Sequence, residues 1–432
     1  MIPLSDYREK LMTAGRAVEL VRSGDRVYIH PGCATPQILI DALLKRADEL
    51  RSVELVHMLT LGSAGYTRPE FEGHFRHAGF FLGGNVRAAV VEGRADYIPI
   101  SLSDIEYLFL SGEMPLDAVF VQTSPPDADG FLSLGVSIDC TLTAASCARH
   151  VIVEMNERMP RTRGETTIHL SRVSAIVESD RPLLEVPPVA SNPVQRRIAR
   201  NVASLVPDGA TLQMGIGGLP NSVWECLADH RDLGIHSEMC SDGAVPLILS
   251  GAINGARKTL HPGKVVAAFV FGSQGLFDLV HENPLFEFHP TAYVNDPCVI
   301  AQNDRMIAIN SALQVDLTGQ VCADSIGITP YSGVGGQLDF VRGAGRSRGG
   351  KAIIALPSTA KNGSVSRIVS VLDPGAGVVT PRSDVHYVVT EHGVAYLRGK
   401  TLRQRAEVLI AIADPKFHDE LSATGIHACV SV

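Results

Sequence analysis

One glutamate lies between two glycine-rich loops, and this combination could carry acyl chemistry. Glu238 falls in the segment GIHSEMCSDG, residues 234–243. A carboxylate can act as a nucleophile on a carbonyl group when hydrogen-bond donors stabilise the oxyanion that forms. A single glutamate among 46 acidic residues is more often a surface group. The interest of Glu238 therefore depends on whether the loops supply such donors.

The first loop is GIGGLP, residues 215–220, which follows a predicted strand and precedes a predicted helix over residues 221–228. It begins like a dinucleotide-binding fingerprint, but Pro220 occupies the last glycine position, so the GxGxxG pattern fails. Its bare backbone N–H groups could approach a ligand closely, assisted by the helix N-terminus. A turn that only connects two elements is the alternative.

The second loop, GVGGQLDF, covers residues 333–340 and leads into a stretch that contains Arg346, Arg348 and Lys351. Many unencumbered N–H donors beside positive charge suit an anionic ligand that carries phosphates. A solvated basic loop is the competing interpretation. Because no Walker pattern GxxxxGK[ST] is present, ATP is not favoured.

Similar units recur in both halves of the chain. A strand over residues 26–30 and a turn over 31–36 are repeated about 185 residues later at 210–214 and 215–220. The strand-like run 118–122 parallels 306–310 at a similar offset. Apolar runs at 151–153, 265–271, 352–356 and 386–390 alternate with helical stretches. This pattern predicts two related α/β domains with largely parallel sheets, whose ligands lie at the carboxyl ends of the strands.

Helix signals support this organisation. Asn192 suits an N-cap before Pro193, which suits a first helical position, and a proline-rich stretch over residues 182–193 marks the boundary between the halves. Apolar residues at spacings of three and four predict one amphipathic helix from about residue 5 to 24.

Composition excludes several classes of protein. The 432 residues are 45% hydrophobic and carry a formal net charge of −8 without a basic stripe, so nucleic acid is not expected as a partner. No apolar run approaches about 18 residues, so we expect no membrane span. The N-terminus lacks the apolar region of a secretory signal, which indicates a cytoplasmic protein. The eight cysteines are scattered singly and predict buried, reduced thiols; without HExxH or paired ligands, no metal is predicted.

Six motifs, taken in order, resemble the acetyl-CoA hydrolase/transferase family, the class I CoA-transferases that include 4-hydroxybutyrate and butyrate:acetate CoA-transferases. They are GIGGLP (215–220), HSEMCSDG (236–243), INSALQVDLTG (309–319), GGQLDF (335–340), GGKAIIALPS (349–358) and VTEHGVAYLRGK (389–400). The N-terminal half matches more loosely, through its length and GGNVR at 83–87.

The resemblance implies an α/β fold with two domains of the NagB/RpiA/CoA-transferase type and an active site at their interface. The first, over residues 1–186, would hold the acid substrate, and the second, over 187–432, would carry the catalytic glutamate and the CoA-binding loops. Glu238 would be the nucleophile of a ping-pong reaction that passes through a glutamyl-CoA thioester. Coenzyme A and its acyl esters would be substrates, with no permanently bound cofactor, and a homodimer or higher assembly is expected.

Further roles follow from matching positions. Asn295 resembles the asparagine that positions the glutamyl group. The expected oxyanion and CoA contacts are Gly215, Ile216, Gly217, Gly218, Leu219, Leu313, Gly335, Gly336 and Lys361.

The acid substrate is harder to infer, because CATP at 33–36 stands where many relatives carry a Gly-Glu-Pro-like turn. His30, Arg76 and Arg87 are candidate partners for a second carboxylate, which would suit succinate or itaconate as well as acetate, butyrate or 4-hydroxybutyrate. A thioester hydrolase, a non-catalytic CoA-binding module and a sugar-phosphate isomerase remain the alternative functions.

Overall fold

The computed structural model describes residues 5–428 and divides the chain into two compact units. Unit 1 comprises the residues up to Pro187 together with Val266–Val294, and unit 2 comprises Pro188–Val265 and the residues from Asn295 onward. The first break lies one residue from the expected boundary between residues 186 and 187. The segment Val266–Val294, which lies within the expected second domain, forms part of unit 1. The expected domains over residues 1–186 and 187–432 stay predictions.

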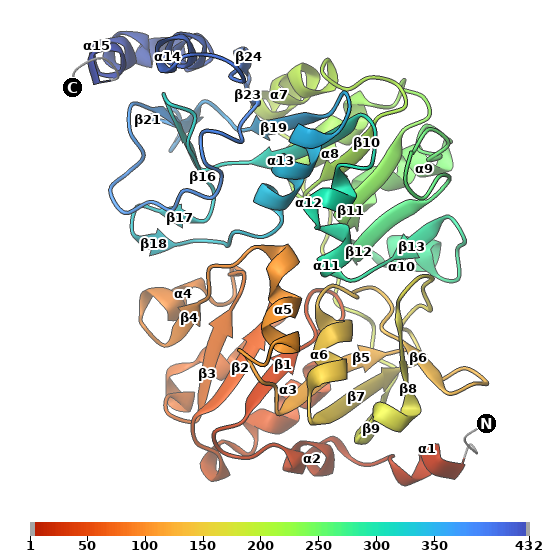
Figure 1. Cartoon of the computed structure of the whole chain (residues 1–432). Coiled ribbons are helices and arrows are strands. Elements are labelled where there is room, and N and C mark those ends of the chain that lie inside the picture. The colour runs from red at the N-terminus through yellow and green to blue at the C-terminus, as the bar shows by residue number, and fades with distance from the viewer. Residues whose placement is uncertain (1–4, 429–432) are drawn as a thin grey trace. The chain divides into compact units, whose positions relative to one another are not determined.

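Unit 1 contains a sheet of seven strands in the order β4-β3-β2-β1-β5-β7-β9 (Figure 1). All of its neighbouring strands run parallel. The strands are β1 (Arg26–Ile29), β2 (Val53–His57), β3 (Phe75–Gly79), β4 (Ala95–Tyr97), β5 (Ala118–Thr123), β7 (His150–Asn156) and β9 (Ala175–Ser179). A separate antiparallel pair joins β6 (Phe131–Ser133) to β8 (Thr167–His169).

Short helices connect these strands, as βαβ crossovers require. The connecting α-helices are α3 (Gln37–Leu44), α4 (Arg87–Val91), α5 (Ile105–Leu110) and α6 (Thr141–Cys147), while α1 (Ser5–Glu9) and α2 (Ala14–Ala17) precede β1. Helix α6 packs against both β5 and α5. Fully buried residues such as Val27, Leu39 and Phe120 form the core between sheet and helices.

Hydrogen bonds explain why Val266–Val294 joins unit 1. Buried Glu106 on α5 accepts hydrogen bonds from the Thr291 hydroxyl (3.1 Å) and the Ala292 N–H (2.7 Å). A bridge also pairs Gly164 with Phe288. These contacts join residues far apart in the sequence, so local patterns did not reveal them. The elements concerned are β12 (Val265–Phe271), α10 (Gln274–Val280), β13 (Phe286–Phe288) and α11 (Thr291–Val294).

Unit 2 repeats the same plan. Its main strands run in the order β11-β10-β14-β19-β23-β24, parallel except for the last pair. They are β10 (Thr211–Met214), β11 (Gly234–Ser241), β14 (Met306–Ser311), β19 (Lys351–Ala355), β23 (Tyr387–Thr390) and β24 (Gly393–Tyr396). Smaller strands are β15 (Gln314–Asp316), β16 (Val321–Cys322), β17 (Ser325–Ile326), β18 (Thr329–Pro330), β20 (Thr359–Ala360), β21 (Val365–Ser366) and β22 (Ile368–Val369).

The helices of unit 2 include α13, which packs against β14 and β19 and begins next to the site described below. They are α7 (Pro193–Ala203), α8 (Gly218–Cys226), α9 (Val245–Leu249), α12 (Pro297–Ile300), α13 (Gln337–Arg346), α14 (Leu402–Ile410) and α15 (His418–Ala428). Helix α7 begins at Pro193 behind a capping box in which the Asn192 side chain accepts from the Gln195 N–H, as predicted.

The predicted duplication is visible in the strand order. In unit 1, β1 lies between β2 and β5, followed by β7 and β9; in unit 2, β10 lies between β11 and β14, followed by β19 and β23. Strands at equivalent places in the sequence therefore occupy equivalent places in the two sheets. The α/β class and the mostly parallel sheets are confirmed.

Two expectations are corrected. The predicted N-terminal helix is broken between α1 and α2, because the chain there pairs with strand β9: the Met12 N–H donates to the Ile176 carbonyl (2.9 Å). Not all cysteines are buried, since Cys298 is exposed and Cys147 and Cys226 are partly exposed. Cys33, Cys140, Cys240 and Cys322 are buried free thiols, and Cys429 lies outside the described residues.

Gly164→Ala is expected to lower the free energy of unfolding by roughly 2–4 kcal/mol. Gly164 has a φ of +110°, and an added Cβ would lie 2.1 Å from the Phe288 carbonyl oxygen. Gly251→Ala is the control, because its φ of +79° is also positive while no atom lies within 4 Å of an added Cβ. That control is expected to lose only about 1 kcal/mol in urea unfolding. Equal losses in the two variants would contradict the proposed steric role of Gly164.

Candidate active site

Glu238 lies near the carboxyl end of β11, where a parallel sheet presents its ligand-binding edge. Its side chain belongs to a strand that is buried over almost its whole length, and the residue is only 9% exposed. An acidic residue so enclosed is uncommon unless it is paired or functional. The sequence-based candidate is therefore not a surface group.

The two carboxylate oxygens of Glu238 have different surroundings. Oε1 accepts a hydrogen bond from Gln213 Nε2 on β10 (3.3 Å). Oε2 is buried and has no hydrogen-bond partner among the described residues. A buried oxygen without a donor is costly in a protein interior, and such atoms concentrate where a substrate completes the arrangement.

Gly336 brings the N-terminus of α13 against this carboxyl group. A Cβ on Gly336 would lie 3.4 Å from both Cδ and Oε2 of Glu238 and only 2.3 Å from Asn295 Nδ2. No residue larger than glycine fits there without displacing Asn295. The preceding Gly335 has a φ of +57°, in the left-handed region that favours glycine. The structure therefore brings together three predicted residues: Glu238, Asn295 and Gly336.

Asn295 and Asp339 complete the buried polar surroundings. Asn295 is fully buried, its Nδ2 lies 3.5 Å from Asp339 Oδ2, and its Oδ1 has no hydrogen-bond partner among the described residues. Asp339 lies in the first turn of α13 and is 4% exposed. An amide with an unused acceptor beside a bare carboxylate oxygen can orient an incoming polar group.

The pKa of Glu238 is raised to about 7, mainly by burial and to a smaller extent by the negative charge of Asp339. A backbone hydrogen bond and the hydrogen bond from Gln213 act in the opposite direction and lower the pKa. The carboxyl group therefore titrates near neutral pH, where it can exist as a reactive, poorly solvated carboxylate.

The first glycine loop begins at the same sheet edge. Gly215 follows β10 directly, and the Ser237 hydroxyl, one residue before Glu238, lies 3.4 Å from the Met214 carbonyl oxygen. Neither Gly215 nor Gly217 has any atom within 4 Å of an added Cβ, so the loop borders open space. Ile216 is 40% exposed, whereas Gly218 and Leu219 begin the buried α8.

Leu313 and Lys361 lie on separate loops. The Gln337 side chain in the first turn of α13 donates to the Ser311 carbonyl (2.7 Å), which places the start of the Leu313 loop next to Gly336. Lys361 lies exposed at the tip of the β20–β21 hairpin, where Lys361 and Asn362 both have positive φ, at +48° and +55°. No described contact joins Lys361 to Glu238, so its role in binding CoA stays a prediction.

The three acid-binding candidates have different surroundings. His30 is fully buried: its Nε2 bonds to the Ser137 carbonyl (2.6 Å) and its Nδ1 accepts from the Gln122 N–H (3.1 Å). No ring nitrogen is left for a substrate carboxylate, so His30 fits a structural role.

Arg76 forms an ion pair with Asp96, with Nη2 2.7 Å from Oδ1. The register Arg26↔Glu54↔Arg76 places it near the amino end of the sheet, roughly 13 Å along the strands from His30. Ligands of this fold usually bind at the opposite, carboxyl edge. Arg76 nevertheless lines a cavity of about 460 Å³ together with Arg94 and Asp96, and its role in acid binding stays a prediction. Arg87 begins α4, and its role stays a prediction.

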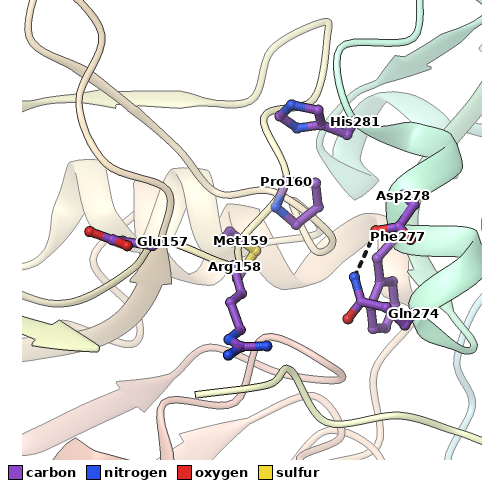
Figure 2. A pocket seen from close by; sticks show the side chains of 8 residues that line it. All are labelled: Glu157, Arg158, Met159, Pro160, Gln274, Phe277, Asp278 and His281. Carbon is purple, nitrogen blue, oxygen red and sulfur yellow. Dashed lines mark hydrogen bonds between the residues drawn. The ribbon is translucent and has the colours of Figure 1, made fainter. Parts of the chain in front are cut away.

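A surface pocket of about 330 Å³ in unit 1 contains none of the predicted site residues (Figure 2). It lies between the segment after β7 and α10, and Gln274 and Asp278 in its wall bond to each other (2.8 Å). Within residues 5–428, no helix is long and apolar enough to cross a membrane.

Sequence reasoning missed Gln213, Asn310 and Asp339. Gln213 and Asn310 are polar residues within apolar strands, at the ends of β10 and β14, and that position was an available signal. Asp339 lay inside the motif GGQLDF but was assigned no role.

Among the described residues, Glu238 is a buried carboxylate with one oxygen that has no hydrogen-bond donor, and it lies against a glycine at a helix N-terminus. The chain belongs to the acetyl-CoA hydrolase/transferase family: the N-terminal domain model of that family matches residues 3–187 and the C-terminal domain model matches residues 272–424. It is therefore an enzyme of this family, as the six motifs indicated.

Individual relatives match over nearly the whole chain. 4-Hydroxybutyrate coenzyme A transferase of Clostridium kluyveri is 50% identical over 96% of this chain and 97% of its own length. The succinyl-CoA:acetate/propanoyl-CoA:succinate CoA transferase of Fasciola hepatica is 47% identical over 93% of this chain and 84% of its own. The crystal structure of RipA from Yersinia pestis is 39% identical, covers 98% of both chains and gives a TM-score of 0.94.

Gly336→Ala is expected to lower the rate of acyl-CoA turnover by at least about 10²-fold, because the new methyl group displaces Asn295 and crowds Glu238. Steady-state rates with an acyl-CoA and an acid measure the effect, and thermal unfolding checks that the fold survives. Gly15→Ala is the control, since Gly15 lies in α2 with no atom within 4 Å of an added Cβ. Undiminished turnover in Gly336→Ala would show that the close approach of Gly336 is not needed.

Proposed function

We propose that this chain transfers coenzyme A between an acyl-CoA and a short carboxylic acid, with Glu238 as the temporary covalent carrier. The observation that carries the proposal is the asymmetry of the Glu238 carboxylate: within residues 5–428, Oε2 is buried without a hydrogen-bond partner and lies against Gly336. The transferase relatives support the reaction class.

The proposed reaction uses acyl bonds of similar reactivity. Oε2 of Glu238 attacks the thioester carbonyl, the carbon–sulfur bond breaks, and CoA leaves as the thiolate, giving a mixed anhydride. The thiolate then attacks Cδ of Glu238, and the Cδ–Oε2 bond breaks to release the first acid. A glutamyl-CoA thioester remains. The second acid reverses these steps, so no electrons are exchanged with a cofactor.

Backbone donors would stabilise the charge that develops on the substrate. The N–H of Gly336 and those of the loop Gly215 to Leu219 are the proposed donors for the thioester oxyanion. Asn295, with its unused Oδ1, would hold the glutamyl group in position. Leu313 and Lys361 remain the proposed CoA contacts. Coenzyme A and the acid are substrates, and the proposal requires no permanently bound group.

The acids proposed are of the 4-hydroxybutyrate, butyrate, acetate, succinate and itaconate type. Arg87, at the start of α4, stays a candidate partner for a second substrate carboxylate. The family also includes hydrolases by its name, so hydrolysis of the glutamyl intermediate is the second candidate function. The enclosure of Glu238 favours transfer, because it limits access of water to the intermediate.

Glu238→Ala is expected to reduce CoA exchange by on the order of 10⁴–10⁶-fold while acyl-CoA still binds, because the variant lacks the nucleophile. Exchange is measured across a panel of the acids above. In the unaltered chain, incubation with acyl-CoA alone should add CoA to the peptide that contains Glu238, as detected by mass spectrometry. Glu407→Ala, an exposed position on α14, is the control. Turnover that persists in Glu238→Ala, or an adduct on another residue, would refute the assignment.

The pH dependence follows from the raised pKa of Glu238, about 7. Because only the ionised carboxylate attacks, kcat/KM should rise with pH through about 7, with unit slope on the acid side, and then level off. Binding of acyl-CoA to Glu238→Ala over the same pH range corrects for titration of the CoA phosphates. A corrected profile that is flat from pH 5 to 8 would contradict a nucleophile that titrates near 7.

A further inference from the structure

The side-chain amide of Gln213 uses all of its hydrogen-bonding capacity. Its Nε2 lies 3.3 Å from Glu238 Oε1 and 3.2 Å from Asn310 Oδ1, and its Oε1 lies 3.2 Å from the Ile309 N and 3.1 Å from Asn310 Nδ2. A backbone N–H can only donate, so the atom that faces Ile309 must be the oxygen. The Gln213 NH₂ group therefore points at Glu238.

Three adjacent strands fix this arrangement. The register pairs Leu212 with Ile235 on β11 and Gln213 with Ala308 on β14. Glu238 and Asn310 each lie two residues beyond the partner of Gln213, so the three side chains share one face of the sheet. Gln213 is fully buried. The sheet and three other hydrogen bonds hold the Gln213 side chain in place. Its NH₂ group therefore loses little conformational entropy when it donates to a negatively charged oxygen.

We propose that Gln213 is a catalytic residue: it holds Oε1 of Glu238, leaves Oε2 as the attacking oxygen, and stabilises the oxyanion formed when thiolate attacks Cδ. In that step the S–Cδ bond forms and an electron pair moves to Oε1, opposite Gln213 Nε2. The pair returns as the Cδ–Oε2 bond breaks and the first acid leaves. Asn310 is a positioning residue, because it touches Gln213 and not Glu238. This inference rests on the proposed nucleophilic role of Glu238.

The hydrogen bond from Gln213 Nε2 to Glu238 Oε1 differs in strength between the states of the proposed reaction. In the anhydride, Oε1 belongs to a neutral carbonyl group and accepts only weakly, whereas in the tetrahedral intermediate it carries a full negative charge. A donor fixed in advance stabilises the second state more than the first, which lowers the barrier. In the resting enzyme the same donor offsets part of the effect of burial and of the facing Asp339 carboxylate on Glu238.

The direct test is Gln213→Met, which keeps the length of the side chain and removes the donor. After mixing with acyl-CoA alone, the glutamyl-CoA thioester on Glu238 should form about 10²–10³-fold more slowly. The affinity for acyl-CoA should stay within about twofold, so the loss falls on kcat. The acid limb of the kcat/KM profile should move to higher pH, because Glu238 loses a donor that lowers its pKa.

Two further variants keep the test informative if Gln213→Met folds poorly. Asn310→Leu keeps the Gln213 NH₂ donor but removes the two hydrogen bonds by which Asn310 orients it. This variant should slow thioester formation less than Gln213→Met does. Gln302→Met, at an exposed glutamine whose Nε2 bonds to the Cys298 carbonyl (3.2 Å), is the control and should behave like the unaltered chain.

The outcomes separate this inference from the proposed function. If Gln213→Met forms the thioester at the unaltered rate and with an unshifted acid limb, Gln213 is not catalytic, although Glu238 can still be the nucleophile. If the unaltered chain forms no adduct on Glu238, the proposed function itself fails. A slower rate with a shifted limb in a folded Gln213→Met, with normal binding, supports the assignment.

Discussion

The structure depends on a carboxylate that is enclosed in the protein and only half satisfied. Burial makes the charged form of Glu238 expensive, and Asp339 adds to that cost. One oxygen is compensated by Gln213, and the other has no donor among the described residues. A bare, poorly solvated oxygen is a stronger nucleophile than a hydrated one, so the energetic cost of burying Glu238 and its proposed role as a nucleophile have the same origin. The neighbouring polar groups, Gln213 and Asp339, leave Oε1 hydrogen-bonded and Oε2 without a donor among the described residues.

In unit 2, adjacent parallel strands and one helix are enough to position the polar groups around Glu238. Adjacent parallel strands bring Gln213, Glu238 and Asn310 to one face at the carboxyl edge of the sheet, where the fold normally binds ligands. Helix α13 then begins directly against Glu238, and only a glycine at residue 336 permits that approach. Strands and a helix hold such groups more exactly than loops can, which suits a reaction that is sensitive to small displacements.

Much of the fold could be predicted because its signals are local. Apolar runs bounded by turns predicted β10, β14 and β19. Asn192 followed by Pro193 predicted the start of α7. The placement of Val266–Val294 in unit 1 depends on contacts such as that of Glu106 with Ala292, which no local pattern encodes.

The site was predicted unevenly. Glu238, Asn295 and Gly336 were found through motif resemblance, and they do lie together. Gln213 and Asn310 were passed over although each is a polar residue near the end of an apolar strand, because their hydrogen bonds to each other and to Glu238 depend on the pairing of β10 with β11 and β14. Arg76 and His30 were proposed from residue type, which does not reveal that Asp96 pairs with Arg76 and that backbone groups contact both ring nitrogens of His30. Their roles in acid binding stay predictions.

The most direct test of the account is a crystal structure of the chain incubated with acyl-CoA in the absence of an acceptor acid. The account requires a thioester between CoA sulfur and Cδ of Glu238, with the remaining carbonyl oxygen facing Gln213 Nε2 at hydrogen-bond distance. A Glu238 that stays unmodified while CoA is bound, or a thioester whose carbonyl oxygen points away from Gln213, would contradict it.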